Sequence, residues 1–223
     1  MIDFSSAADW RAEFTESLNR FGYSEEWADP LFSVMESVVT TPLQQDGMTL
    51  SQVTSKKRLN EWSFTLPMAL VTGEVSPESL LDALSVASSP TIQAYRPYLL
   101  RLHFRAMKGF LKGIVDLVFE HRGRWYVIDY KSNDLGDHQL DYHHERLVSV
   151  MAKHHYVLQY HIYVSALHRH LKHTLPGYDY QTHFGGVAYL FLRGMTGDAT
   201  YGVFRDRPPQ QRIEALDKLW GLS

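Results

Sequence analysis

The sequence predicts an α/β fold with a mixed central sheet flanked by helices. Three observations lead to this prediction: helical spacing of apolar residues near the start, a β-hairpin at the centre, and another buried strand after a long helical stretch. We find no internal repeat, low-complexity tract or linker in the 223 residues. We therefore expect a single domain over residues 1–223.

The first part of the chain alternates between helical and extended patterns. Residues 7–41 are expected to be helical, with a break or a first helical turn at Asp29-Pro30. Strict alternation over residues 59–66 predicts a strand that stops at Pro67. Residues 76–78, Ser-Pro-Glu, are typical of the start of a helix with proline at its first position.

The clearest element is a hairpin. Residues 111–120 and 124–130 are rich in β-branched and aromatic residues, and only His-Arg-Gly separates them. The other segments are expected to be an irregular basic stretch over 88–108, an exposed loop over 132–145, a long helix over roughly 146–172, a buried strand over 185–192 and a final helix after Pro208-Pro209.

Composition excludes several classes of protein. The chain has no cysteine, which rules out disulfides, thiolate metal sites and cysteine nucleophiles. No apolar run approaches the roughly 20 residues needed to cross a bilayer, and we expect a cytoplasmic protein. The formal net charge of −3 hides a gradient, because residues 1–50 are strongly acidic whereas residues 91–135 have eight basic and four acidic residues. A basic region of this size is by itself more typical of a solvated face, and it indicates a polyanionic partner only together with the motifs that lie within it.

Two aspartates and a lysine come together in the predicted hairpin. If the chain turns at Arg122-Gly123, Asp116 lies directly opposite Asp129, with their Cβ atoms about 5 Å apart. Lys131 is two residues beyond Asp129, so its side chain lies on the same side of the strand. A turn one residue longer or shorter would change this register. The sequence predicts two carboxylates and one ammonium group together on one side of the sheet.

The neighbours of both aspartates are mostly apolar, which is typical of strands covered on both faces. Two buried carboxylates repel each other and lose hydration, so either one holds a proton or a cation lies between them. Oxygen ligands favour Mg²⁺, with Mn²⁺ as the other choice. Lys131 would offset negative charge, position a water or polarise a phosphate oxygen. The alternative is a purely structural Asp–Lys–Asp cluster.

These motifs resemble the PD-(D/E)xK nuclease superfamily. The quoted segments are Leu111–Phe119, Asp129–Asn133 (Asp-Tyr-Lys-Ser-Asn), the Gln-x-x-x-Tyr element within Leu158–Tyr163, and His183–Gly194. Together they are similar to the C-terminal nuclease domain of the RecB-type branch, and the likeness covers most of the chain. The resemblance implies a restriction-endonuclease-like fold.

The resemblance also implies roles for particular residues. Asp116 and Asp129 would be metal ligands, together with the backbone carbonyl of Tyr130. Lys131 would orient or activate the attacking water, which makes Asp116, Asp129 and Lys131 the implied catalytic residues. Gln159 and Tyr163, four residues apart on one helix face, would support the site and the DNA strand.

The function implied by the resemblance is that of an Mg²⁺-dependent exodeoxyribonuclease of the exonuclease V type. It would hydrolyse phosphodiesters of single-stranded DNA within a RecBCD-type helicase–nuclease during double-strand break repair and recombination. Its partners would be DNA, the RecC and RecD subunits and the RecA recombinase, and no membrane.

One family feature is unmatched. The family's first motif is a helix that carries a metal-ligand histidine, and residues 1–42 contain no histidine. We therefore expect a domain that lacks this helix, either because the segment was removed or because the ligand was lost. Two alternatives follow: a catalytically inactive DNA-binding or protein-docking module with the same fold, or a metal phosphatase.

The nine histidines over residues 138–173 lack zinc-ligand spacing and favour a polar helix face.

Overall fold

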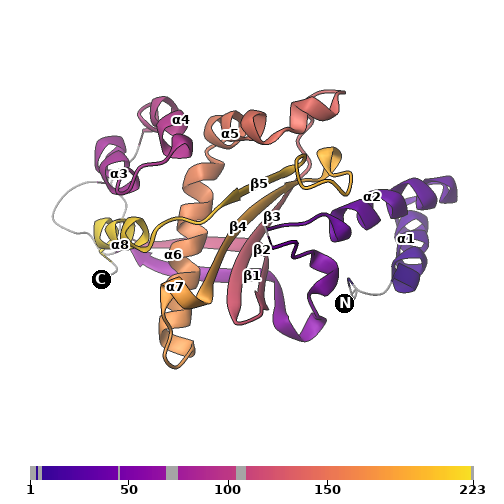
Figure 1. Ribbon diagram of the computed structural model, residues 1–223, viewed down its shortest axis with the longest axis horizontal. Helices are drawn as coiled ribbons and strands as arrows, with labels where there is room; N and C mark the ends of the chain where they lie inside the picture. Colours follow the sequence, from indigo (N-terminus) through magenta and orange to yellow (C-terminus); the bar gives the residue numbers. More distant parts are fainter. Residues whose placement is uncertain (1–3, 5–6, 45, 69–74, 104–108, 222–223) are drawn as a thin grey trace.

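The computed structural model describes residues 4, 7–44, 46–68, 75–103 and 109–221, with only the backbone for residues 7–9 and 11 (Figure 1). The described strands form one five-stranded sheet, in which their spatial order follows their order in the chain. β3 and β4 are parallel, and the other neighbouring strands are antiparallel. The strands are β1 (Arg58–Met68), β2 (Gly109–His121), β3 (Arg124–Lys131), β4 (Phe184–Phe191) and β5 (Val203–Asp206).

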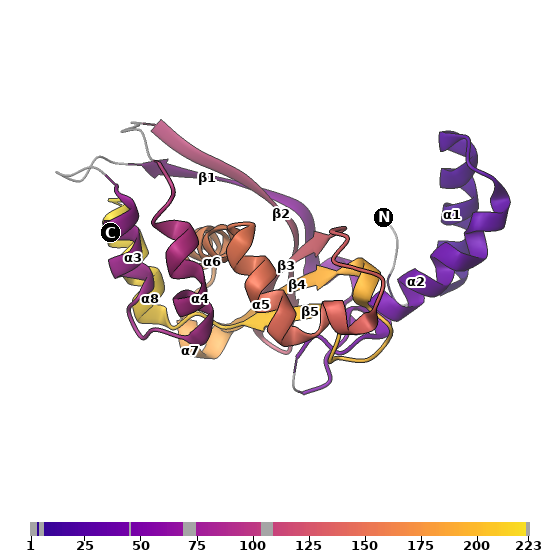
Figure 2. The ribbon, with the colours of Figure 1, turned by 90° about the horizontal axis from the view of Figure 1, so that it is seen from above.

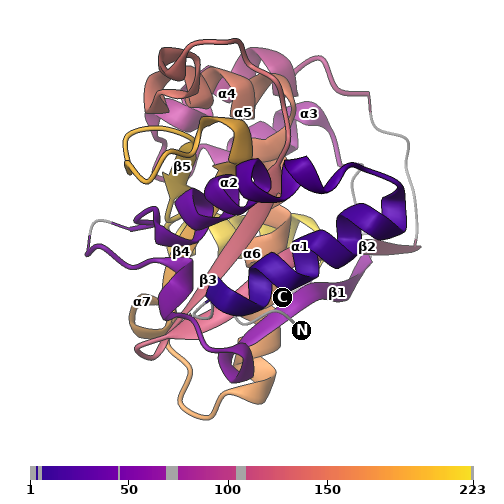
Figure 3. The same cartoon turned by 90° about the vertical axis from the view of Figure 1, so that its right-hand side faces the viewer.

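Two hydrophobic layers enclose this sheet, which confirms the predicted fold of a mixed sheet flanked by helices. The larger layer lies between the sheet and the helices α3 to α8, and the smaller one lies under α1 and α2 (Figures 2 and 3). None of the described helices is long and apolar enough to cross a membrane. The helices are α1 (Ala7–Phe21), α2 (Ala28–Thr40), α3 (Pro77–Leu84), α4 (Pro90–Leu99), α5 (His144–Lys153), α6 (Tyr156–Thr174), α7 (Tyr180–His183) and α8 (Gln210–Leu219).

The hairpin of β2 and β3 has the register that the sequence predicts. Arg122 and Gly123 form the turn with φ angles of 50° and 80°, a left-handed pair that suits a two-residue hairpin. His121 pairs with Arg124, and the ladder continues to the pair Leu117 and Ile128. It ends there, one pair before the two aspartates would meet.

The predicted long helix over 146–172 is wrong in one respect, because it is two helices. α5 ends at Lys153 and α6 begins at Tyr156. Between them His155 has a left-handed φ of 57°, which a continuous helix does not allow. The Nδ1 atom of His155 lies 3.0 Å from the hydroxyl of Tyr95, so a tertiary contact fixes this break.

Three other expectations need correction. Residues 88–108 are not irregular throughout, because Pro90 at the first helical position begins α4; residues 104–108 lie outside the described part. β1 does not stop at Pro67 but runs through it to Met68, which is tolerated because β1 is an edge strand. The short strand β5 was not predicted, because its four residues are too few for a periodic signal.

A bend in β1 and β2 lies where the site forms. Val115 packs in the larger layer and Leu117 in the smaller one, although residues two apart in a regular strand share a face. On β1, Glu61 has a φ of 50°, and the ladder omits the pair of Glu61 and Asp116 between flanking pairs of unchanged register. Such irregularities re-aim side chains, and this one frees Asp116 from a regular pleat.

The close packing beside this bend gives a stability prediction. A Cβ atom at Gly113 would lie 2.5 Å from the Phe64 ring, which is buried in the larger layer. Gly113→Ala should therefore lower the free energy of unfolding by about 1–3 kcal/mol, measured by urea denaturation. Ile114→Ala, at the next and 57% exposed position, is the control and should change it little. Equal effects of the two changes would contradict this packing.

Candidate active site

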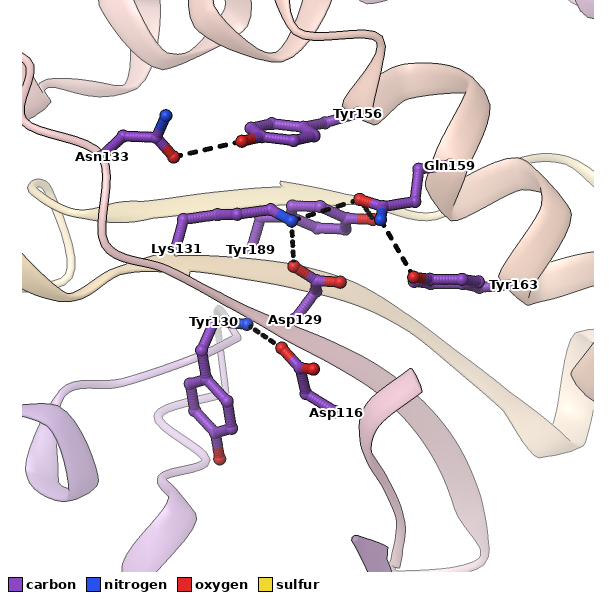
Figure 4. A network of polar contacts seen from close by, with 9 residues as sticks. All are labelled: Asp116, Asp129, Tyr130, Lys131, Asn133, Tyr156, Gln159, Tyr163 and Tyr189. Carbon is purple, nitrogen blue, oxygen red and sulfur yellow. Dashed lines mark hydrogen bonds and ion pairs between the residues drawn. The ribbon is translucent and has the colours of Figure 1, made fainter. Parts of the chain in front are cut away.

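Asp129 and Lys131 lie at the carboxyl end of β3, on the face that α6 covers (Figure 4). Their side chains form an ion pair, and they are only 4% and 12% exposed. The period of two along the strand brings them to the same face, as the sequence predicts. A buried lysine charge requires compensation, and Asp129 supplies the main part of it.

Gln159 on α6 connects this ion pair to the helix. Its Oε1 accepts hydrogen bonds from Lys131 Nζ at 3.2 Å and from the hydroxyl of Tyr189 at 3.0 Å. Its Nε2 donates to the hydroxyl of Tyr163 at 2.9 Å, one helical turn away. The structure therefore brings Gln159 and Tyr163 into the same cluster as Lys131. Tyr163 also packs against Phe64, so it has a structural role as well.

Two tyrosines that sequence reasoning missed complete the surroundings of Lys131. Its Nζ lies 4.0 Å from the ring centroid of Tyr156 and 5.1 Å from that of Tyr189. The faces of aromatic rings attract cations, so both rings stabilise the ammonium charge. Two signals could have found them: Tyr156 is three residues before Gln159 on the helix, and Tyr189 pairs with Asp129 in the parallel register.

A further contact orients the Tyr156 ring. Its hydroxyl donates a hydrogen bond to Asn133 Oδ1 at 3.2 Å. Asn133 follows β3 directly after Lys131 and Ser132, so the same segment carries the lysine and the residue that positions its aromatic partner. The ring is therefore held from both ends, by its helix and by this amide.

Asp116 reaches the site from β2 by a different route from the one predicted. Instead of a ladder pair, its Oδ2 accepts a hydrogen bond of 2.8 Å from the backbone N–H of Tyr130, between Asp129 and Lys131. The Asp116 carboxylate therefore lies beside the ion pair, and Figure 4 shows the three charged groups converging. The Tyr130 ring lies in the smaller hydrophobic layer. The role of the Tyr130 carbonyl as a ligand stays a prediction.

Burial dominates the electrostatics of Asp129. Its loss of hydration raises the pKa of this carboxyl from 3.8 to about 6; Lys131 opposes the shift, and the negative charge of Asp116 adds to it. Apart from the ion pair with Lys131, Asp129 Oδ1 has no hydrogen-bond partner among the described residues. A carboxylate in this state gains from any additional cation. Burial and the two nearby carboxylates also raise the pKa of Tyr163 to about 12, so its hydroxyl stays protonated.

The carboxylates of this site can hold a hard divalent cation such as Mg²⁺, but they offer few ligands. Asp116 and Asp129 offer carboxylate oxygens, and Mg²⁺ is commonly held by one or two carboxylates together with waters and substrate phosphates. Among the described residues, no group of three or more His, Asp or Glu side chains is placed to hold a metal ion. Glu61, the nearest additional acid on β1, lines with Asp116 a cavity of about 540 Å³ next to α2. Two side-chain ligands are therefore available.

Comparison with protein families identifies the class. The model of the PD-(D/E)XK nuclease superfamily matches residues 68–219, a range that contains the hairpin, α6 and β4. The chain belongs to the PD-(D/E)xK nuclease superfamily. The sheet, the two aspartates and the lysine are therefore parts of a nuclease fold.

Individual relatives narrow this assignment. The chain is 36% identical over 222 residues to the RecBCD enzyme subunit RecB of Escherichia coli (strain K12). This alignment covers 98% of the chain and 18% of the relative. The chain is 36% identical over 208 residues to the same subunit of Haemophilus influenzae, covering 91% and 16%. For the Mycobacterium tuberculosis (strain H37Rv) subunit the identity is 38% over 190 residues, covering 78% and 17%. The chain is thus a RecB-like nuclease domain that spans less than a fifth of these relatives.

The raised pKa of Asp129 gives a prediction of pH dependence. The folded state binds a proton at the Asp129 carboxyl more tightly than the unfolded state does. The bound proton therefore stabilises the fold fully below pH 3.8, and this stabilisation is lost as pH rises through about 6. In metal-free buffer, the free energy of unfolding of Asp129→Asn minus that of wild type should rise by up to about 3 kcal/mol over this range. Urea denaturation at several pH values measures it. Exposed Asp82→Asn is the control, and a flat difference for Asp129→Asn would contradict the shift.

The contact between Lys131 and Tyr156 gives a second prediction. Ring currents should shift the ε-methylene protons of Lys131 upfield, and Tyr156→Phe should preserve this shift because it keeps the ring. Tyr156→Leu should remove most of it and cost about 0.5–2 kcal/mol of stability. Proton–carbon NMR of protein with ¹³C-labelled lysine measures the shift, and Lys131→Arg assigns the signal. An unchanged signal in Tyr156→Leu would show that the ring does not cover the ammonium group.

Proposed function

We propose that this chain is an Mg²⁺-dependent deoxyribonuclease that cleaves single-stranded DNA as part of a RecBCD-type helicase–nuclease. The convergence of Asp116, Asp129 and Lys131 supports this proposal most directly. The chain's membership of a nuclease superfamily and its similarity to RecB subunits support the same proposal. Because these relatives are RecB subunits of RecBCD enzymes, the partners would be RecC and RecD, with RecA as a further partner in recombinational repair.

In this mechanism Asp116 and Asp129 would hold the Mg²⁺ ion, and the Tyr130 carbonyl would be a further ligand. When bound, the ion would lower the pKa of a coordinated water and stabilise negative charge on the scissile phosphate. Lys131 would donate a hydrogen bond to the attacking water or to a phosphate oxygen. Its position is fixed by Gln159 and the two tyrosine rings, so the ammonium group is already oriented before substrate binds.

Substitutions of the charged cluster test the proposal. With 5′-labelled linear single-stranded DNA and Mg²⁺, Asp129→Asn and Lys131→Gln should each lower the cleavage rate at least about 100-fold, because each removes charge next to the reacting phosphate. Lys153→Gln, an exposed cation at the end of α5, is the control and should keep the wild-type rate. Excess EDTA should stop cleavage.

A wild-type rate in Asp129→Asn or Lys131→Gln would refute this active site. An inactive docking or DNA-binding module is the second candidate, and the presence of only two described side-chain ligands favours it. It predicts no cleavage by the wild-type chain under any divalent-ion condition, together with measurable binding of DNA.

A further inference from the structure

A groove of about 440 Å³ runs between the edge strand β1 and the second half of α6. One wall is the segment Trp62–Pro67, and the other is α6 beyond the candidate active site. The residues that line it are Trp62, Ser63, Phe64, Thr65, Leu66, Pro67, Ala166, Arg169, His170 and His173. This groove is separate from the cavity next to α2 and contains neither of the aspartates.

The groove continues the helix face that begins at the active site. Gln159 and Tyr163 contact the lysine cluster, and His170 and His173 follow them on α6 at intervals of seven and three residues. These intervals keep residues on one face of a helix. The groove therefore lies beyond Tyr163 on this helix face, and the buried Tyr163 ring, in edge-on contact with Phe64, lies between the groove and the lysine cluster.

Aromatic rings mark the wall formed by β1. The Trp62 ring contacts His170 edge-on with centroids 5.4 Å apart, and Phe64 contacts Tyr163 edge-on at 5.8 Å. Trp62 directly follows Glu61, the residue opposite Asp116, so this wall also begins at the bend that forms the site. Stacking on an aromatic ring is how proteins bind unpaired bases with little sequence preference.

The charges of the groove suit a phosphate backbone. The described residues that line it include Arg169, His170 and His173 and no carboxylate. Lys172 is exposed on the same helix but does not line the groove, so a change of its charge serves as a control for charge changes within the groove. A groove lined by one arginine, two histidines and aromatic rings fits one strand, whereas the bases of a duplex are already stacked and paired.

We propose that this groove binds a single-stranded segment of the DNA substrate, with a base stacked on Trp62 and the backbone along the second half of α6. This inference rests on the proposed nuclease function and adds the path of the substrate to it. The wall of β1 from Trp62 to Pro67 is roughly 17 Å long, enough for a short stretch of nucleotides. Of the histidines on α6, His170 and His173 line the groove, whereas His161 and His168 are buried.

Binding in the absence of metal tests the groove independently of cleavage. The dissociation constant of fluorescein-labelled (dT)20 for the whole chain is measured in EDTA by fluorescence anisotropy. Trp62→Leu should weaken binding about 5- to 100-fold because a stacking surface is lost. Trp62→Phe should retain most of the affinity because it keeps an aromatic ring. The melting temperature of each variant establishes that it is folded.

A pair of charge changes at exposed Thr65 avoids the core and gives effects of opposite sign. Thr65→Lys should tighten binding and Thr65→Glu should weaken it, each severalfold at low salt. Lys172→Gln removes a full charge from the same helix outside the groove, so its effect should be smaller than that of Thr65→Glu. A purely structural role of this segment predicts no such reversal of sign.

The two proposals fail in different ways. Wild-type affinity in Trp62→Leu, or equal affinities in Thr65→Lys and Thr65→Glu, would overturn the groove even if Asp129→Asn abolishes cleavage. Conversely, the expected binding changes together with unaltered cleavage by Asp129→Asn would leave the groove in place and overturn the nuclease site. No measurable binding of (dT)20 by the wild type would also overturn the groove.

Discussion

The buried ion pair between Asp129 and Lys131 is the constraint on which the rest of the site depends. An ammonium group with so little contact with water is stable only if its charge is compensated. Asp129, the Gln159 amide and two tyrosine rings provide that compensation, and they come from β3, α6 and β4. The Lys131 ammonium group is therefore stable only when α6 packs on the sheet. This buried charge in turn determines which face of α6 lies against the sheet.

The third charged group reaches this cluster through an irregularity of the sheet. A regular β2 would place Asp116 in a ladder pair, but the bend opposite Glu61 lets its carboxylate accept the N–H of Tyr130. That hydrogen bond sets two carboxylates next to each other where burial already disfavours charge. The result is a site with two carboxylates and one ammonium group, and a divalent cation would relieve its excess of negative charge.

The sequence predicts the local parts of this arrangement well. The turn at Arg122-Gly123 determines the hairpin register, and the period of the strand determines that Asp129 and Lys131 share a face. Contacts between distant segments were not predictable in the same way. Tyr156 approaches Lys131 only because the helix breaks at His155, and that break depends on a tertiary contact with Tyr95. The bend at Asp116 likewise leaves no short-range pattern, because it is visible only in the pairing with β1 and in the change of layer between Val115 and Leu117.

Titration of the chain with Mg²⁺ by isothermal calorimetry shows whether these carboxylates hold a divalent ion. We expect binding heat for the wild-type chain and for Lys131→Gln, because lysine is no ligand. We expect none for the folded double variant of Asp116→Ala and Asp129→Ala. Wild-type affinity in that double variant would mean that the ion is bound elsewhere and that Asp116 and Asp129 are not its ligands.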